Sequence, residues 1–282
     1  MKPLPARSMV AIAALCAGTG LAYAQQQAAP KDAVPVSSAP TTQTTPANPV
    51  VLEPEKQILV TGQPRALQGF QSNYQVYRKG SLAGTAMMQV VRLGPNRWRV
   101  DLGIRGTKGL AGFAALNSQQ STVFDQVGTR YVPVSQSTVL KTVLSSDKIV
   151  GTYNWQTQQA RWTGDIKKSR QLPVALQPGD MNLLLVNLAV VRDARPGQAL
   201  NYRLVDRGRA KPIHFLAAAA QETLKVGEDG FQALPVRRTG VSADESLTVW
   251  VSEGVPTPIR MLLVQDDVGE LDLQLASYKV IQ

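Results

Sequence analysis

The chain has 282 residues, one cysteine, one histidine and a formal net charge of +10 at neutral pH. With Cys16 as the only cysteine, an intramolecular disulfide is excluded, and with His214 as the only histidine, a zinc site built from several imidazoles is excluded. The positive charge favours anionic partners, but the cations are scattered along the chain, so nucleic acid is not expected among them.

The N-terminus has the three-part pattern of a secretory signal peptide. Lys2 and Arg7 precede the apolar run 9–15, and Ala22-Tyr23-Ala24 supplies an A-x-A cleavage site. The apolar run is shorter than the roughly 20 residues that a membrane-spanning helix needs. The sequence therefore predicts a signal peptide over residues 1–24. After its cleavage we expect a periplasmic protein that has no cysteine and is not an integral membrane protein.

The segment after the signal peptide differs in composition from the rest of the chain. Gln, Ala, Pro, Ser and Thr dominate residues 25–49, without a periodic apolar pattern. Such a segment buries too little apolar surface to offset the entropy of ordering it. We expect a disordered Pro/Gln/Thr-rich linker over residues 25–66 and a single β-rich domain over residues 67–282.

The N-terminal half of that domain reads as a series of antiparallel strands. The clearest alternation places Trp98, Val100, Leu102 and Ile104 on one face of a strand, with polar residues between them. Turn residues separate this strand from its neighbours, for example Gly94-Pro95-Asn96. The predicted strands are 70–77, 82–93, 97–104, 121–126, 130–140, 148–155 and 160–164.

One helix is predicted in the middle of the domain, over residues 181–193. Pro178-Gly179-Asp180 supplies a break and an N-cap residue, and Pro196-Gly197 follows the end. The helix is apolar on nearly every face, so it should be buried against the sheet. The segment 215–220 fits either a strand or a helical turn. Further strands are predicted over 245–253, 259–265 and 270–280.

The order of these features resembles a domain-of-unknown-function family of exported proteobacterial proteins. The resemblance rests on Tyr74-x-Val76-Tyr77, a glycine-containing return at Gly80 and Gly84, the helix led by Pro178-Gly179-Asp180, and the late pair Thr248-Val249-Trp250 and Pro258-Ile259-Arg260. It covers residues 68–281. The family has no agreed activity, so it implies no catalytic residue.

The resemblance implies a periplasmic location and a fold like the half-barrel carriers of lipoproteins. With the strand pattern, the expected fold class is mainly β: a curved antiparallel sheet, half-barrel or barrel, with one apolar helix packed on or in it. Fold alone does not establish function.

Two short motifs invite a catalytic interpretation. His214 could act as the base of a Ser-His-Asp triad, but no G-x-S-x-G motif accompanies it. Ser145-Ser146-Asp147-Lys148 matches S-x-x-K, but the S-D-N and K-T-G elements of penicillin-binding enzymes are missing from the sequence. We interpret His214 as structural and 145–148 as a polar turn.

Glycines recur every third residue at Gly103, Gly106, Gly109 and Gly112, with Arg105 and Lys108 between them. Backbone N–H groups of a glycine-rich loop can form a concavity that binds anions. A strand-to-strand loop without a ligand is the simpler interpretation. The candidate functional feature of this loop is a basic rim formed by Arg105 and Lys108.

The apolar helix is the other candidate site. A ligand cavity beneath it would be lined by Met181, Leu184, Leu185, Leu188 and Val191, and ordinary core packing of the same residues is the alternative. The acidic pairs Asp244-Glu245 and Asp266-Asp267 lie at predicted turns, where solvation explains them.

The sequence predicts a non-enzymatic periplasmic binding or carrier module for an apolar or lipid-like ligand, with no cofactor and no metal. The alternative is an envelope structural or interaction protein whose partner is another envelope protein. In that case the protein's own side chains would fill the cavity, and an apolar patch or a free strand edge would be exposed.

Overall fold

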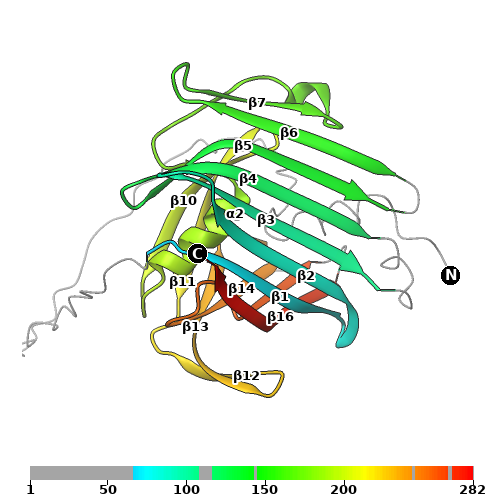
Figure 1. Ribbon diagram of the computed structural model, residues 1–282, viewed down its shortest axis with the longest axis vertical. Helices are drawn as coiled ribbons and strands as arrows, with labels where there is room; N and C mark the ends of the chain where they lie inside the picture. Colours follow the sequence, from blue (N-terminus) through cyan, green and yellow to red (C-terminus); the bar gives the residue numbers. More distant parts are fainter. Residues whose placement is uncertain (1–65, 108–115, 143–144, 243–244, 266–268, 282) are drawn as a thin grey trace, which may run out of the picture. The chain divides into compact units, whose positions relative to one another are not determined.

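A curved β-sheet and one α-helix make up most of the structure (Figure 1). The computed structural model describes residues 66–281, except 108–115, 143–144, 243–244 and 266–268. The predicted signal peptide and almost all of the predicted linker lie outside the described residues. The mainly antiparallel β-sheet with a single long helix confirms the predicted fold class.

The first half of the domain is a meander in which each strand pairs with the next. Alternation of apolar and polar residues forms these strands, and in β3 the residues Trp98, Val100, Leu102 and Ile104 are buried as predicted. The bounds are β1 (Gly69–Arg78), β2 (Ser81–Arg92), β3 (Arg97–Gly106), β4 (Asn117–Val127), β5 (Arg130–Lys141), β6 (Ser146–Asn154), β7 (Gln159–Gly164) and β8 (Val174–Ala175).

The second half returns to the first strand. A short 3-10 helix, η1 (Lys168–Arg170), comes before these strands in the chain. The helix α2 (Leu183–Asp193) lies between β9 and β10. The remaining strands are β9 (Asp180–Met181), β10 (Ala199–Asp206), β11 (Arg209–Ala217), β12 (Glu222–Val226), β13 (Asp229–Thr239), β14 (Ser246–Ser252), β15 (Arg260–Gln265) and β16 (Gly269–Ile281).

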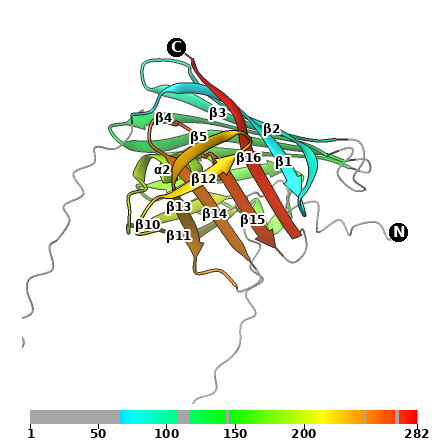
Figure 2. The same cartoon turned by 90° about the horizontal axis from the view of Figure 1, so that it is seen from below.

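The strand order brings the two halves together at β1. The order is β8-β7-β6-β5-β4-β3-β2-β1-β16-β15-β14-β13-β11-β10-β9, with β12 paired to β13. All pairs are antiparallel except β9 with β10. The first and last strands therefore lie side by side in the middle of the sheet, as Figure 2 shows.

The two ends of the sheet meet at a seam that side chains close. Among the described strands no backbone ladder joins β8 to β9. Instead the Tyr153 hydroxyl donates to the Val205 carbonyl at 2.8 Å, and the Gln136 amide donates to the Asp206 carboxylate at 2.5 Å. Arg203 reaches Asp180 at 2.5 Å and the Ala175 carbonyl at 3.4 Å. The sheet is thus barrel-like, and polar side chains complete its closure.

The helix begins two residues later than predicted. Asp180 does not cap it but lies in β9, where its carboxylate pairs with Arg203. Asn182 takes the N-cap position, and its side chain accepts from the Leu185 backbone N–H at 3.2 Å. The cap moved because the carboxylate of Asp180 is already engaged across the seam.

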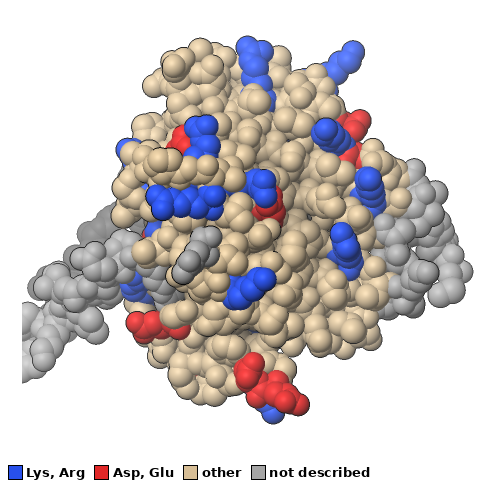
Figure 3. All heavy atoms as spheres, in the orientation of Figure 1, with Lys and Arg blue, Asp and Glu red and all other residues tan. Residues whose placement is uncertain are grey.

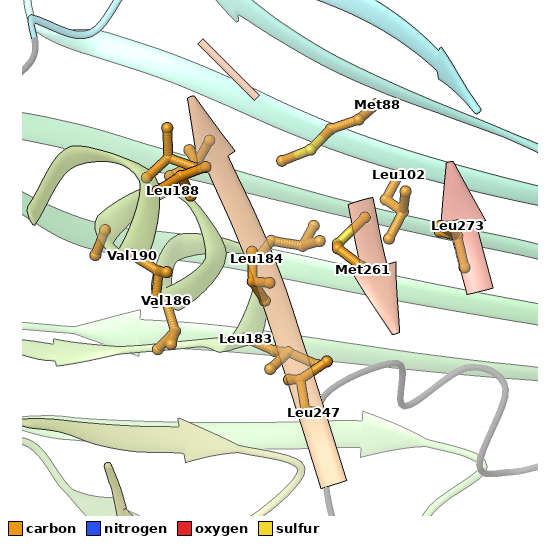
Figure 4. Packing of buried hydrophobic residues seen from close by; sticks show 14 of the residues in the cluster. Met88, Leu102, Leu183, Leu184, Val186, Leu188, Val190, Leu247, Met261 and Leu273 are labelled. Carbon is orange, nitrogen blue, oxygen red and sulfur yellow. The ribbon is translucent and has the colours of Figure 1, made fainter. Parts of the chain in front are cut away.

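The helix is surrounded by the sheet. All residues from Leu183 to Val191 are buried, and α2 contacts β3, β4, β5 and β10. Figure 4 shows Leu184 and Leu188 among side chains of the sheet that include Met88 and Met261. A helix that is apolar on every face can be stable only where apolar neighbours cover every face, and the curved sheet provides them.

The glycine-rich segment was interpreted as a loop, and this is wrong for its first part: Gly103 lies in the strand predicted over 97–104, and that strand continues to Gly106. Gly103 and Gly106 lie within β3, where they pair with Met87 and Gly84 of β2. Gly109 and Gly112 lie outside the described residues. The strand extends because its backbone pairs on both sides, with β2 and with β4.

Tyr74 fastens the loop between β14 and β15 to the centre of the sheet. The Tyr74 side chain is buried, and its hydroxyl lies against the Thr257 hydroxyl and donates to the Pro258 carbonyl at 2.9 Å. Ser72 also lies 3.3 Å from the Thr257 hydroxyl. The loop of residues 253–259 is therefore held by buried hydrogen bonds.

Burial of Tyr74 predicts a loss of stability at alkaline pH. Desolvation is the largest cause that raises the pKa of Tyr74, to about 12. In the unfolded chain the phenol ionises near pH 10, so between about pH 10 and 12 the unfolded state releases a proton that the folded state keeps, and stability falls by up to about 3 kcal/mol.

Other buried tyrosines add to the loss of stability at alkaline pH. The contribution of Tyr74 is therefore measured by comparing the unmodified protein with Tyr74→Phe. Urea unfolding at pH 8 and at pH 11.5 should show a smaller alkaline loss for Tyr74→Phe than for the unmodified protein. Equal losses in the two proteins would contradict the role given to the Tyr74 hydroxyl.

Candidate ligand-binding pocket

A pocket of about 440 Å³ opens at one end of the buried helix. This volume lies in the range of about 300–1,000 Å³ that is typical of small-molecule sites. Four segments that are distant in sequence form it: the chain leading into β1 together with the start of β1, the start of β5, the second half of α2, and the loop between β14 and β15. The lining residues are Ala66, Leu67, Gln68, Phe70, Tyr131, Leu188, Val191, Arg192, Glu253, Gly254, Val255 and Pro256.

The wall of the pocket is mainly apolar and belongs to the core. Phe70, Leu188, Val191 and Val255 are buried members of the main hydrophobic cluster. Leu67 packs against the same cluster from the entry to β1. The pocket is therefore an unfilled end of the core rather than a groove between polar loops.

Arg192 is held in a fixed position on the pocket wall. Its Nε and Nη2 donate to Asp193 at 2.6 and 2.7 Å, and its Nη1 donates to the Thr129 carbonyl. The guanidinium carbon lies 4.5 Å from the ring centroid of Tyr131, a cation–π contact. All three nitrogens have partners, so the guanidinium is positioned before any ligand arrives.

Asp193 raises the pKa values of two neighbours, although burial is the largest single influence on each of them. Burial lowers the pKa of Arg192, but the hydrogen bond and charge of Asp193 outweigh this, and the net pKa is raised. Burial, followed by the Asp193 charge, raises the pKa of Tyr202, whose hydroxyl donates to Asp193 at 3.0 Å. Arg192 and Asp193 form an ion pair on the pocket wall, in which the two charges compensate each other.

The five residues predicted to line a cavity divide into two groups, and one of them, Met181, lies in β9 rather than in the helix. Leu188 and Val191 are on the pocket wall. Met181, Leu184 and Leu185 are buried in the main cluster and do not line this pocket. The position along the helix separates the groups, since only its C-terminal half reaches the open end of the core.

The predicted basic rim is not at this pocket. Arg105 is exposed on the outer face of β3 and lines a different hollow of about 760 Å³, and Lys108 lies outside the described residues. Gly103 also lines that hollow, and a Cβ added to it would meet no atom within 4 Å. Amide, hydroxyl and charged side chains from β1 to β5 surround it. The apolar pocket and Arg105 therefore form separate features.

The motifs with a catalytic interpretation are not assembled. His214 is in β11, and its Nδ1 lies 2.6 Å from the Asn201 Oδ1 of β10. The Ser145 hydroxyl lies 3.2 Å from the Thr142 hydroxyl. Ser146 to Lys148 belong to β6, so the turn predicted over 145–148 is shorter than expected.

Within the described part of the chain, no group of three or more His, Cys, Asp and Glu side chains is placed to hold a metal ion. The same residues include no helix that is long and apolar enough to cross a membrane. Asp244, Asp266 and Asp267 of the predicted acidic pairs lie outside the described residues.

Sequence reasoning missed most of the pocket. Phe70 and Tyr131 were expected only as strand residues, and Val255 and Pro256 only as part of a turn. One signal was present: the turn after β14 carries apolar residues, and Val255 is buried although it lies outside a strand. Apolar residues in a turn indicate that the turn packs against the hydrophobic core.

The fold and pocket define a class of barrel-like β-sheet proteins with an internal helix and an apolar opening at one end. No protein-family model and no curated protein matches the sequence. Among solved structures, the chain is similar to a β-barrel-like protein of the domain of unknown function DUF1849 from Brucella abortus. The similarity covers 77% of this chain and 99% of that chain, with a TM-score of 0.49 and 9% sequence identity.

Proposed function

We propose that this protein is a non-enzymatic binding module of the periplasm that carries a slender apolar ligand, such as an acyl chain, in the pocket at the end of α2. The observation that carries the proposal is the 440 Å³ opening bounded by Phe70, Leu188, Val191 and Val255. An apolar cavity of about 150 Å³ is already large enough to bind benzene. The signal-peptide pattern supports the periplasmic location.

The charges at the pocket favour an uncharged chain inside it. Arg192 is neutralised by Asp193 and has all of its nitrogens engaged, so it offers little to an anionic headgroup. Glu253 is exposed at the opening and would repel an anion. We therefore expect the apolar part of the ligand to enter the pocket and any polar head to remain in water.

Filling the pocket should abolish binding. Val191→Phe adds a ring to the wall, and we expect the dissociation constant of the fluorescent fatty acid cis-parinaric acid to rise at least about tenfold. Leu188→Phe fills the opening from a neighbouring turn of the helix and should act in the same way. Fluorescence titration measures both, and circular dichroism shows whether each variant is folded.

Leu216→Phe is the matched control, because Leu216 is 49% exposed on β11 and away from the pocket. It should bind the probe as the unmodified protein does. Native mass spectrometry of the protein from an exporting host should show an apolar passenger. An unloaded mass together with no uptake of the probe would overturn the proposal.

A second candidate function is suggested by β16. Its pairing with β15 stops at Gln274, while its pairing with β1 continues to Ile281. In the projecting part Tyr278 and Val280 are 41% and 54% exposed. An envelope interaction protein could add a partner strand at this edge. If the pocket binds nothing, this edge is where the search for a protein partner should begin.

A further inference from the structure

Two segments that are distant in sequence form one positively charged surface. Lys167, Lys168 and Arg170 come from η1 and the residue before it, and Arg207 and Arg209 come from the turn between β10 and β11. The two backbones touch: a Cβ added to Gly208 would lie 2.0 Å from the Arg170 carbonyl oxygen. We call these five cations the basic surface. Lys and Arg side chains, blue in Figure 3, project from the top of the molecule, which is the end where Figure 1 labels β7.

The cations are close enough to affect one another. The pKa of Arg170 is lowered, first by burial and then by the charges of Arg209 and Arg207. Arg207 and Gly208 both have positive φ, 46° and 71°, as in a type I′ turn, where Asn and Gly are preferred. An arginine at this position places a charge at the tip of the turn.

An exposed leucine accompanies the basic surface. Leu172 is 66% exposed, more than any other large apolar side chain of the described residues. On either side of this segment, Ile166 and Val174 pack against the buried cluster of Tyr153 and Trp162. The segment from Lys167 to Pro173 is therefore fixed at both ends, and Leu172 remains outside the core.

Two carboxylates lie beside the basic surface in the sequence: Asp165 shortly before Lys167, and Asp206 directly before Arg207. Asp165 accepts from the Lys148 backbone N–H at 2.7 Å, and Asp206 accepts from Gln136 at the seam. Neither bond uses a cation of the basic surface. The five cations outnumber these two carboxylates, so the surface keeps a net positive charge that an external anion can meet.

We propose that the basic surface, with Leu172, docks the protein on an anionic phospholipid bilayer. Clustered cations bind the headgroup layer, and an apolar side chain beside them inserts at its boundary with the acyl chains. A soluble anion would use the charges but would gain nothing from an exposed leucine. This is why a bilayer fits the combination better than a phosphate ion or a polyanion.

Bilayer docking is independent of the pocket. Asp206, next to the basic surface, bonds Gln136, which also bonds Asn182 at the start of the helix. The pocket lies at the other end of the same helix, near Arg192. A failure of either proposal leaves the other standing.

Flotation with lipid vesicles tests the docking surface. The protein as purified after export should bind phosphatidylglycerol-containing vesicles and not pure phosphatidylcholine vesicles. The test variant combines Arg207→Asn with Arg209→Glu, and the asparagine suits the positive φ of position 207. We expect this variant to bind the vesicles about 30-fold more weakly or worse, because each cation near an anionic surface strengthens binding roughly fivefold. Leu172→Asp should weaken it about tenfold.

Lys225→Glu combined with Lys279→Glu is the control, because both lysines are exposed, and they lie on β12 and β16, neither of which pairs with β7, β10 or β11. We expect this variant to lose less than half as much binding free energy as the arginine variant, as measured on folded proteins. Excess inorganic phosphate should not displace the vesicles. Equal losses in the two variants, displacement by phosphate, or unchanged binding of Leu172→Asp would each overturn bilayer docking.

Discussion

Replacing Arg203 with methionine should lower the free energy of unfolding by about 3–5 kcal/mol. Asp180 is 1% exposed, and its Oδ2 accepts from Arg203 at 2.5 Å and from the Gln177 backbone N–H at 2.7 Å. Removing the guanidinium leaves the buried carboxylate without its counter-charge. The contact of Arg203 with the Ala175 carbonyl, which links β8 to β10, is lost as well.

Chemical denaturation of three variants separates these effects. Arg99→Met removes a more exposed pair with Asp101 and should cost no more than about 1 kcal/mol. Adding Asp180→Asn to Arg203→Met removes the buried charge and should restore a large part of the stability. If Arg203→Met costs no more than Arg99→Met, the seam does not depend on this ion pair.

The second large effect concerns the interior of the helix. Leu185 is fully buried in the main cluster and does not line the pocket, so Leu185→Ala should cost about 2–5 kcal/mol of stability. The cost arises from the lost burial of the side chain and from the cavity that remains. Thermal or urea unfolding measures it.

Measuring probe binding by Leu185→Ala distinguishes whether Leu185 only stabilises the fold or also contacts the ligand. The folded variant should bind cis-parinaric acid as the unmodified protein does, whereas Val191→Phe should not. Leu216→Ala, on the surface, should change stability by less than about 0.5 kcal/mol. Loss of probe binding without loss of stability in Leu185→Ala would mean that the ligand reaches deeper into the helix environment than the pocket indicates.

The strands with one buried face could be predicted from the sequence. The strands β1 to β7 and β14 to β16 were all expected from alternation and turn residues, although β4 starts four residues before its predicted bound. By contrast, β10 and β13 were not predicted. In β13 the residues Ala233 to Val236 are buried consecutively, so no alternation marks the strand. The undecided segment 215–220 starts in β11 and leaves it after Ala217.

The candidate site was harder to predict than the fold. The helix was identified because eight of its eleven residues are apolar and a break and a stop signal flank it. Which of its residues border open space depends on where the sheet ends, and that is a property of the assembled structure. The basic surface had the same difficulty, since Arg170 and Arg209 are brought together only when η1 packs on the turn between β10 and β11.

The pairing of β1 with β16 also determines the order in which the domain can fold. β1 has two partners, and one of them, β16, is made last. The strands β1 to β7 can form from near neighbours, but the sheet becomes continuous only when the C-terminal strand arrives. Closing so long a loop costs entropy before any contact is gained, and folds dominated by such contacts form slowly. A chain that lacks its final strand would therefore remain open, with β1 and the core beside it accessible to other molecules.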